Sequence, residues 1–112
     1  MKAKEEFIRK KAQEHIPERK EKIAWSLHAV KKLRAEGLRK KDVEESLKEC
    51  IILEDYDMEG RPLPGCLLLG FIESVPVHAV IAIDEDFDRI FIITVYKPSP
   101  ERWQNDWKTR KK

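Results

Sequence analysis

The chain has 112 residues, of which 41% are apolar and 39% are charged, and its 23 basic and 21 acidic residues leave a net charge of +2. This length fits one domain with one modest core, and the near balance of charges excludes a uniformly basic protein. The longest uncharged run, residues 62–72, contains two prolines and two glycines and is too short and too broken to span a bilayer.

The first half of the chain predicts three helices, at residues 4–14, 17–36 and 40–49, because apolar positions recur there at helical spacing. Pro17 suits the first position of the second helix, since its fixed φ is helical. Gly37 supplies the left-handed cap that ends this helix. The apolar stripe of the second helix consists of Ile23, Leu27, Val30 and Leu33.

The second half of the chain predicts strands and turns. Residues 57–65 have the glycines and prolines of a loop, and residues 84–89 form a turn that closes an antiparallel hairpin. The runs rich in β-branched and apolar residues predict four strands, at residues 50–56, 66–72, 75–83 and 90–96.

The segment after the last strand predicts a short C-terminal helix. Ser99 stands at the cap position and Pro100 at the first helical position, with Trp103 and Trp107 one turn apart on the apolar edge. Helices come first and strands follow in one block. The fold class is therefore α+β, with the N-terminal helices packed on a single, roughly four-stranded antiparallel sheet.

Charge is distributed unevenly along the chain. Residues 1–49 carry 15 basic against 10 acidic residues, residues 50–90 carry 2 against 9, and residues 91–112 carry 6 against 2. The basic ends suit RNA or an acidic protein as partner, although ordinary solvated helix faces produce the same pattern. Cys50 and Cys66 show neither metal-ligand nor redox spacing and no signal peptide is recognised, so we expect a cytoplasmic protein with reduced thiols.

Two histidines are the main candidates for proton transfer. His28 lies on the predicted second helix beside Lys32, away from the apolar stripe, where it faces either solvent or a second packing partner. His78 lies in an apolar strand, and burying an unpaired ring there costs roughly 1–3 kcal/mol, so it needs a partner or lies at the mouth of a cavity.

The last predicted strand offers a hydroxyl and a phenol. Thr94 and Tyr96 are expected on the same face of this strand as Ile90 and Ile92. The length of the preceding turn decides whether His78 lies opposite Thr94 or Tyr96, and so joins them, or is shifted by one residue and lies on the other face.

These side chains suffice for cleavage of RNA by its own 2′-hydroxyl without a metal. His28 or His78 would carry the proton, Tyr96 and Thr94 would orient the phosphate, and cations would stabilise its charge. A zinc site built from the histidines and an acid matches no ligand spacing, so neither metal nor cofactor is expected. The tryptophan pair either stacks on bases or covers a sheet edge. The cations assigned to phosphate binding are Lys32, Lys97 and Arg102.

An ordered set of short motifs resembles the prokaryotic family known as domain of unknown function 4258. The resemblance covers about residues 25–107, and that family is similar to RelE/ParE-like toxins and to the barnase, colicin and RelE ribonuclease fold. The motifs are Leu27–Val30, Glu36–Leu38, Asp42–Val43, Ile52–Tyr56, Leu67–Gly70, Val77–Val80, Ile93–Pro98 and Trp103.

The resemblance implies an N-terminal basic helical extension over residues 1–24 and a RelE-like domain over residues 25–112. It also implies a metal-independent endoribonuclease of the toxin–antitoxin kind, which acts on RNA or the ribosome and pairs with a cognate antitoxin. The family pattern falls on four candidate site residues: His28, His78, Thr94 and Tyr96.

A second interpretation is a non-catalytic module that binds protein or RNA. The predicted sheet region carries acidic segments at residues 54–59 and 84–88, whereas toxins of this kind concentrate basic residues around the cleft. Clustering of the candidate residues at a shared cavity favours the enzyme, and a His78 ring packed among valines favours the module.

Overall fold

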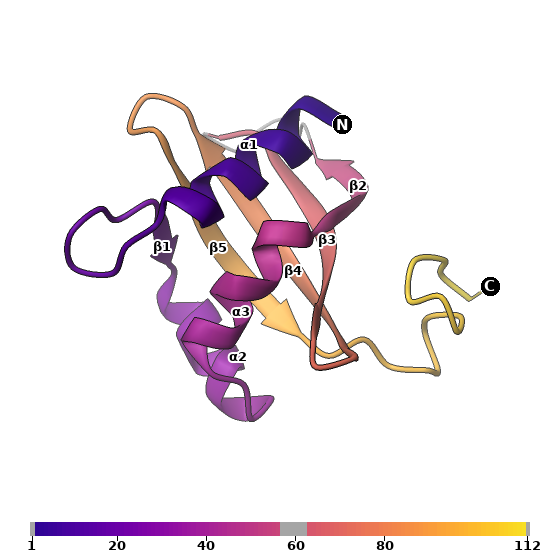
Figure 1. The fold of residues 1–112 in the computed structure, drawn as a ribbon. Coiled ribbons are helices and arrows are strands. Elements are labelled where there is room, and N and C mark those ends of the chain that lie inside the picture. Colours follow the sequence, from indigo (N-terminus) through magenta and orange to yellow (C-terminus); the bar gives the residue numbers. More distant parts are fainter. Residues whose placement is uncertain (1, 57–62, 112) are drawn as a thin grey trace.

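The computed structural model describes residues 2–56 and 63–111, and a five-stranded sheet with the order β1-β5-β4-β3-β2 is its centre (Figure 1). The elements are α1 (Lys2–Glu14), β1 (Ile23–Trp25), α2 (Leu27–Ala35), α3 (Lys40–Ser46), the 3-10 turn η1 (Leu47–Glu49), β2 (Ile51–Tyr56), β3 (Gly65–Ile72), β4 (Val75–Asp84) and β5 (Arg89–Tyr96). Most of the predicted loop at residues 57–65 lies outside the described residues.

The sheet is mixed, so the prediction of a four-stranded antiparallel sheet is wrong. The segment Ile23–Trp25, predicted as part of the second helix, is a strand that pairs in parallel with β5. Ser26 explains the difference, because its side chain accepts a hydrogen bond from the backbone N–H of Ala29 at 2.9 Å. This N-cap starts α2 ten residues after Pro17, and Gly37 ends it with φ +68°, as predicted.

The main core lies between one face of the sheet and the helices. Alternate residues of β4 point into it, and the buried residues of α1, α3 and η1 pack on them, among them Ile8 and Leu47, which are both fully buried. Gly70 on β3 permits the close approach of α3, because a Cβ there would lie 2.9 Å from Ser46 Oγ. The β4 residues of this face are Val77, Ala79, Ile81 and Ile83.

Two side chains of helix α1 also bond to the backbone at the outer edge of the sheet, at the start of β2. Arg9 donates from Nε and Nη2 to the carbonyl of Cys50, at 2.9 and 2.7 Å, and Glu5 Oε1 accepts from the N–H of Ile52 at 2.9 Å. These contacts satisfy backbone groups that an edge strand otherwise offers to another chain. The predicted boundary between residues 24 and 25 falls inside β1, and the division into extension and domain stays a prediction.

A bulge in β5 changes which side chains face the core. Ile81 lies opposite Ile92, whereas Val80 lies opposite Thr94, so one extra residue is accommodated at Ile93. Directly opposed residues share a face, and Thr94 therefore lies on the face away from α1 and α3 while Ile92 stays in the core. The expectation that Thr94 and Tyr96 share a face with Ile90 and Ile92 is wrong for this reason.

The C-terminal segment, residues 97–111, contains no helix, contrary to prediction. Ser99 closes only one turn, in which its carbonyl accepts from the N–H groups of Arg102 and Trp103 at 3.1 and 3.0 Å. Trp103 then packs on the sheet and pairs with Arg110 as an isolated bridge. Long-range contacts thus override a local helix-start signal. Within the described residues, no helix is long and apolar enough to cross a membrane.

Candidate functional site

A cleft of about 400 Å³ lies between α2, the end of β5 and the C-terminal segment. Helix α2 supplies side chains one turn apart, β5 supplies its last residue, and the C-terminal segment closes the far side. Four cations, one carboxylate and one phenol give the cleft its chemistry: Lys32, Lys97, Arg102, Arg110, Glu36 and Tyr96.

Two of the four cations already have acidic partners. Arg110 donates to Glu54 from Nε and Nη2 at 2.8 and 3.1 Å, which raises the pKa of Arg110 and lowers that of Glu54. Lys32 Nζ lies 4.0 Å from Glu36. Four cations against these two carboxylates leave a net charge of +2 at the cleft.

The two remaining cations are available to a ligand. In the described part of the chain, the side chains of Lys97 and Arg102 have no ion-pair partner, and both residues are exposed. Unpaired cations in a concave surface attract anions, since the partly enclosed geometry concentrates the field. The cleft therefore has the electrostatic character of an anion site.

Tyr96 forms the wall of the cleft and contacts a buried histidine behind it. Tyr96 Oη lies 3.2 Å from Nδ1 of His78, the residue directly opposite on β4. His78 is fully buried, and its Nε2 lies 2.7 Å from the backbone carbonyl of Trp107. Burial lowers the pKa of His78 and raises that of Tyr96, so both groups are neutral near pH 7.

His28 and Thr94 form a second histidine–hydroxyl pair beside the cleft. His28 Nε2 lies 3.2 Å from Thr94 Oγ1, and the His28 ring is exposed to solvent. His28 precedes Lys32 by one helical turn, and Thr94 precedes Tyr96 by two residues on the same face of β5. The pair therefore lies next to the cleft-lining residues of α2 and β5 along the chain.

The structure thus brings most of the predicted site residues to one place. Lys32, Tyr96, Lys97 and Arg102 line the cleft, and His28 and Thr94 adjoin it. His78 contacts Tyr96 but lies beneath the C-terminal segment, with both ring nitrogens engaged. Sequence reasoning missed Arg110 because a basic tail gives no signal of a contact to Glu54, 56 residues away.

Trp103 is buried and supports the fold of the C-terminal segment. Only 3% of its surface is exposed, and its ring meets that of His78 edge-on with centroids 4.4 Å apart, while the guanidinium of Arg110 lies 4.7 Å from its centroid. A ring enclosed on these sides has no free face for a base. Trp103 instead fastens the C-terminal segment to the sheet.

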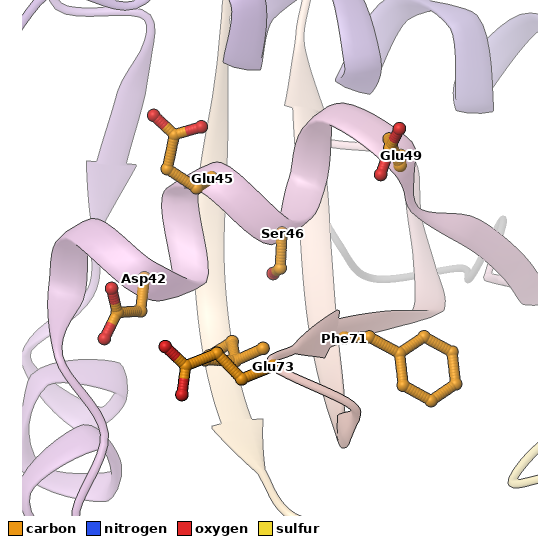
Figure 2. A pocket seen from close by; sticks show the side chains of 7 residues that line it. Asp42, Glu45, Ser46, Glu49, Phe71 and Glu73 are labelled. Carbon is orange, nitrogen blue, oxygen red and sulfur yellow. The ribbon is translucent and has the colours of Figure 1, made fainter.

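A second pocket, of about 310 Å³, lies between α3 and the β3–β4 turn and is acidic. Figure 2 shows that its carboxylates are spread around the helix, with Glu45 pointing away from Glu73. Ser46 also lines this pocket, and its hydroxyl donates to the Val43 carbonyl at 2.6 Å. Among the described residues, no group of three or more histidine, cysteine or acidic side chains has the arrangement of a metal site.

The family model described as "Domain of unknown function (DUF4258)" matches residues 25–97. The chain belongs to this family. No curated protein and no solved structure matches the chain. The match runs from β1 to Lys97 and so includes the α2 and β5 sides of the cleft, whereas Arg102 and Arg110 lie beyond it. The similarity to RelE/ParE-like toxins stays a prediction.

Proposed function

We propose that this protein binds RNA and holds its phosphodiester backbone in the cleft between α2, β5 and the C-terminal segment. The observation that carries the proposal is the convergence of four cations on one cleft that keeps a net charge of +2. Phosphate contacts from lysine and arginine supply most of the affinity of such binding. RNA is the phosphate ligand we favour, because the family that the motifs resemble is similar to RelE/ParE-like toxins, a resemblance that implies action on RNA.

The acidic turn between β4 and β5 does not argue against this proposal. Asp88 directly precedes β5, which ends at Tyr96, and the eight residues of this strand span roughly 25 Å. This exceeds the screening length of about 8 Å at physiological salt. Asp88 is also neutralised by Lys11 and Lys22, at 2.6 and 2.8 Å, so the turn repels a ligand in the cleft only weakly.

The test is the salt dependence of binding to a short fluorescent single-stranded RNA. Two unpaired cations predict a slope of log affinity against log salt near −1.4, at about 0.7 per neutralised phosphate. Lys97→Gln or Arg102→Gln is expected to reduce the magnitude of that slope by about 0.7 each. Lys41→Gln on α3, which makes the same change of net charge away from the cleft, is the control. Equal effects of all three variants would refute the assignment of the cleft.

RNA cleavage is a second candidate function, favoured by the exposed His28 beside Thr94. The 2′ oxygen attacks the adjacent phosphorus while His28 takes its proton, and Thr94 orients the ring. The bond to the 5′ oxygen breaks and that oxygen takes a proton from water, which leaves a 2′,3′-cyclic phosphate and a 5′-hydroxyl. His78 is too deeply buried to contact RNA directly, so we give the proton transfer to His28.

Cleavage is tested on labelled RNA in excess chelator, with and without translating ribosomes. A 2′,3′-cyclic product that disappears in His28→Gln would support His28 as the proton carrier. Folded protein that binds RNA but yields no such product in either format would leave the protein as a binding module. The protein partner implied by the resemblance, an antitoxin, remains to be sought in either case.

A further inference from the structure

We propose that Tyr96 makes the cleft selective for ribose over deoxyribose by accepting a hydrogen bond from a 2′-hydroxyl. This inference rests on the proposed function and adds to it the feature of the nucleic acid that is recognised. It follows from the direction of two hydrogen bonds behind the cleft, which together leave the Tyr96 oxygen as a hydrogen-bond acceptor towards a ligand.

The first hydrogen bond fixes the His78 tautomer. The backbone carbonyl of Trp107 can only accept, so His78 Nε2, 2.7 Å away, carries the ring proton. A neutral imidazole then has an unprotonated Nδ1, which can only accept. The ring is kept neutral by its burial among Leu69 on β3, Tyr96 on β5 and Trp103 of the C-terminal segment.

The second hydrogen bond fixes the Tyr96 hydroxyl. With Nδ1 of His78 as acceptor at 3.2 Å, the single proton of the phenol points into the protein. The lone pairs of Tyr96 Oη are what remains for the cleft. An acceptor cannot stabilise a phosphate oxygen, which is itself an acceptor, so Tyr96 is not a phosphate contact.

The surrounding cations supply the phosphate contacts instead. Lys32, Lys97 and Arg102 line the same cleft as the Tyr96 acceptor. In RNA the 2′-hydroxyl is a hydrogen-bond donor on the ribose carbon adjacent to the one that carries the 3′-phosphate, so a donor and an anion occur close together. DNA has the anion without the donor. The pairing of acceptor and cations therefore fits a ribonucleotide and leaves a deoxyribonucleotide with one unmet contact.

The test compares affinities of matched RNA, DNA and 2′-O-methyl RNA of one sequence for the full chain. The methyl ether keeps the 2′ oxygen but removes its proton. We expect RNA to bind about two- to tenfold more tightly than both others, which is the range that one net hydrogen bond provides. In Tyr96→Phe this ratio is expected to fall to about one. Tyr56→Phe removes the other phenol, which bonds Glu54 outside the cleft lining, and is expected to retain the ratio.

Each outcome separates the inference from the proposed function. A ratio of affinities measured on one protein sample does not depend on how much of a variant is folded. Equal binding of all three oligonucleotides by the wild type, or 2′-O-methyl RNA binding as tightly as RNA, would overturn the role of Tyr96 and leave phosphate binding intact. If Tyr96→Phe lowers the affinity for RNA and for DNA equally, the hydrogen-bond donor that Tyr96 meets lies on a base and not on the ribose. This result would also overturn the proposed role of Tyr96. Absence of binding to any oligonucleotide would overturn the proposed function itself.

Discussion

The neutral state of buried His78 predicts a distinctive dependence of stability on pH. His78 is fully buried with both ring nitrogens engaged, and burial lowers its pKa below the usual 6.5. In the unfolded chain the ring protonates near pH 6.5, so the unfolded state binds more protons below that pH. The contribution of neutral His78 is therefore complete above pH 6.5 and is lost as the pH falls towards the folded-state pKa.

The size of the effect follows from linkage. One proton taken up only by the unfolded state changes the free energy of unfolding by at most about 1.4 kcal/mol per pH unit. Between pH 7 and pH 5 the loss amounts to about 2 kcal/mol if the folded ring stays neutral throughout. Carboxylates with lowered pKa values, such as Glu54 and Asp88 (pKa about 2), change the free energy of unfolding only at more acidic pH, below about pH 4.5.

Urea unfolding followed by tryptophan fluorescence measures this loss, and His78→Gln is the comparison. Glutamine does not titrate, so the variant is expected to be less stable than the wild type at pH 7 but to lose about 2 kcal/mol less stability between pH 7 and pH 5. His15 and His28 are present in both proteins and their contributions cancel in the difference. Parallel loss of stability in the wild type and in His78→Gln would refute a neutral, buried His78 and with it the hydrogen-bond direction assigned to Tyr96.

Two further predictions concern the segments that sequence patterns placed wrongly. Trp103→Ala removes a side chain that is 3% exposed and is expected to lower the free energy of unfolding, measured with urea, by about 3–5 kcal/mol. Trp107→Ala keeps the backbone carbonyl that His78 Nε2 bonds, so its loss of unfolding free energy is expected to be clearly smaller. Ser26→Ala removes the N-cap of α2 and is expected to cost about 0.5–2 kcal/mol, and a loss below that range would mean that β1 alone fixes the start of the helix.

The strands of the second half were predictable because their local signals agree with their tertiary role. Continuous apolar runs bounded by turn residues gave β3, β4 and β5 to within a residue or two of their observed ends. The three residues of β1 carry no such signal. Their strand conformation depends on pairing with β5, in which Ile90 N–H donates to the Lys22 carbonyl and Ser26 N–H to the Ile92 carbonyl, contacts that span more than 60 residues.

The C-terminal segment shows the same limit more strongly. Ser99, Pro100 and Glu101 carry every local mark of a helix start, and one turn does form. The chain then departs because the Trp103 ring gains burial against His78 and Arg110 gains a two-point hydrogen bond with Glu54. Both partners, His78 and Glu54, are distant in sequence, so neither is visible to a pattern that considers only neighbouring residues.

The bulge at Ile93 places the hydroxyls of a predicted core strand on the surface proposed here to bind RNA. Without it, the two-residue period of β5 would place Thr94 and Tyr96 beside Ile92, among the side chains that pack under the helices. With it, both hydroxyls move to the other face, where Tyr96 meets His78 and Thr94 meets His28. The residues proposed as the site were therefore identifiable from their chemistry and from the resemblance. Their convergence depends on a single inserted residue in the ladder, which alternation alone cannot reveal.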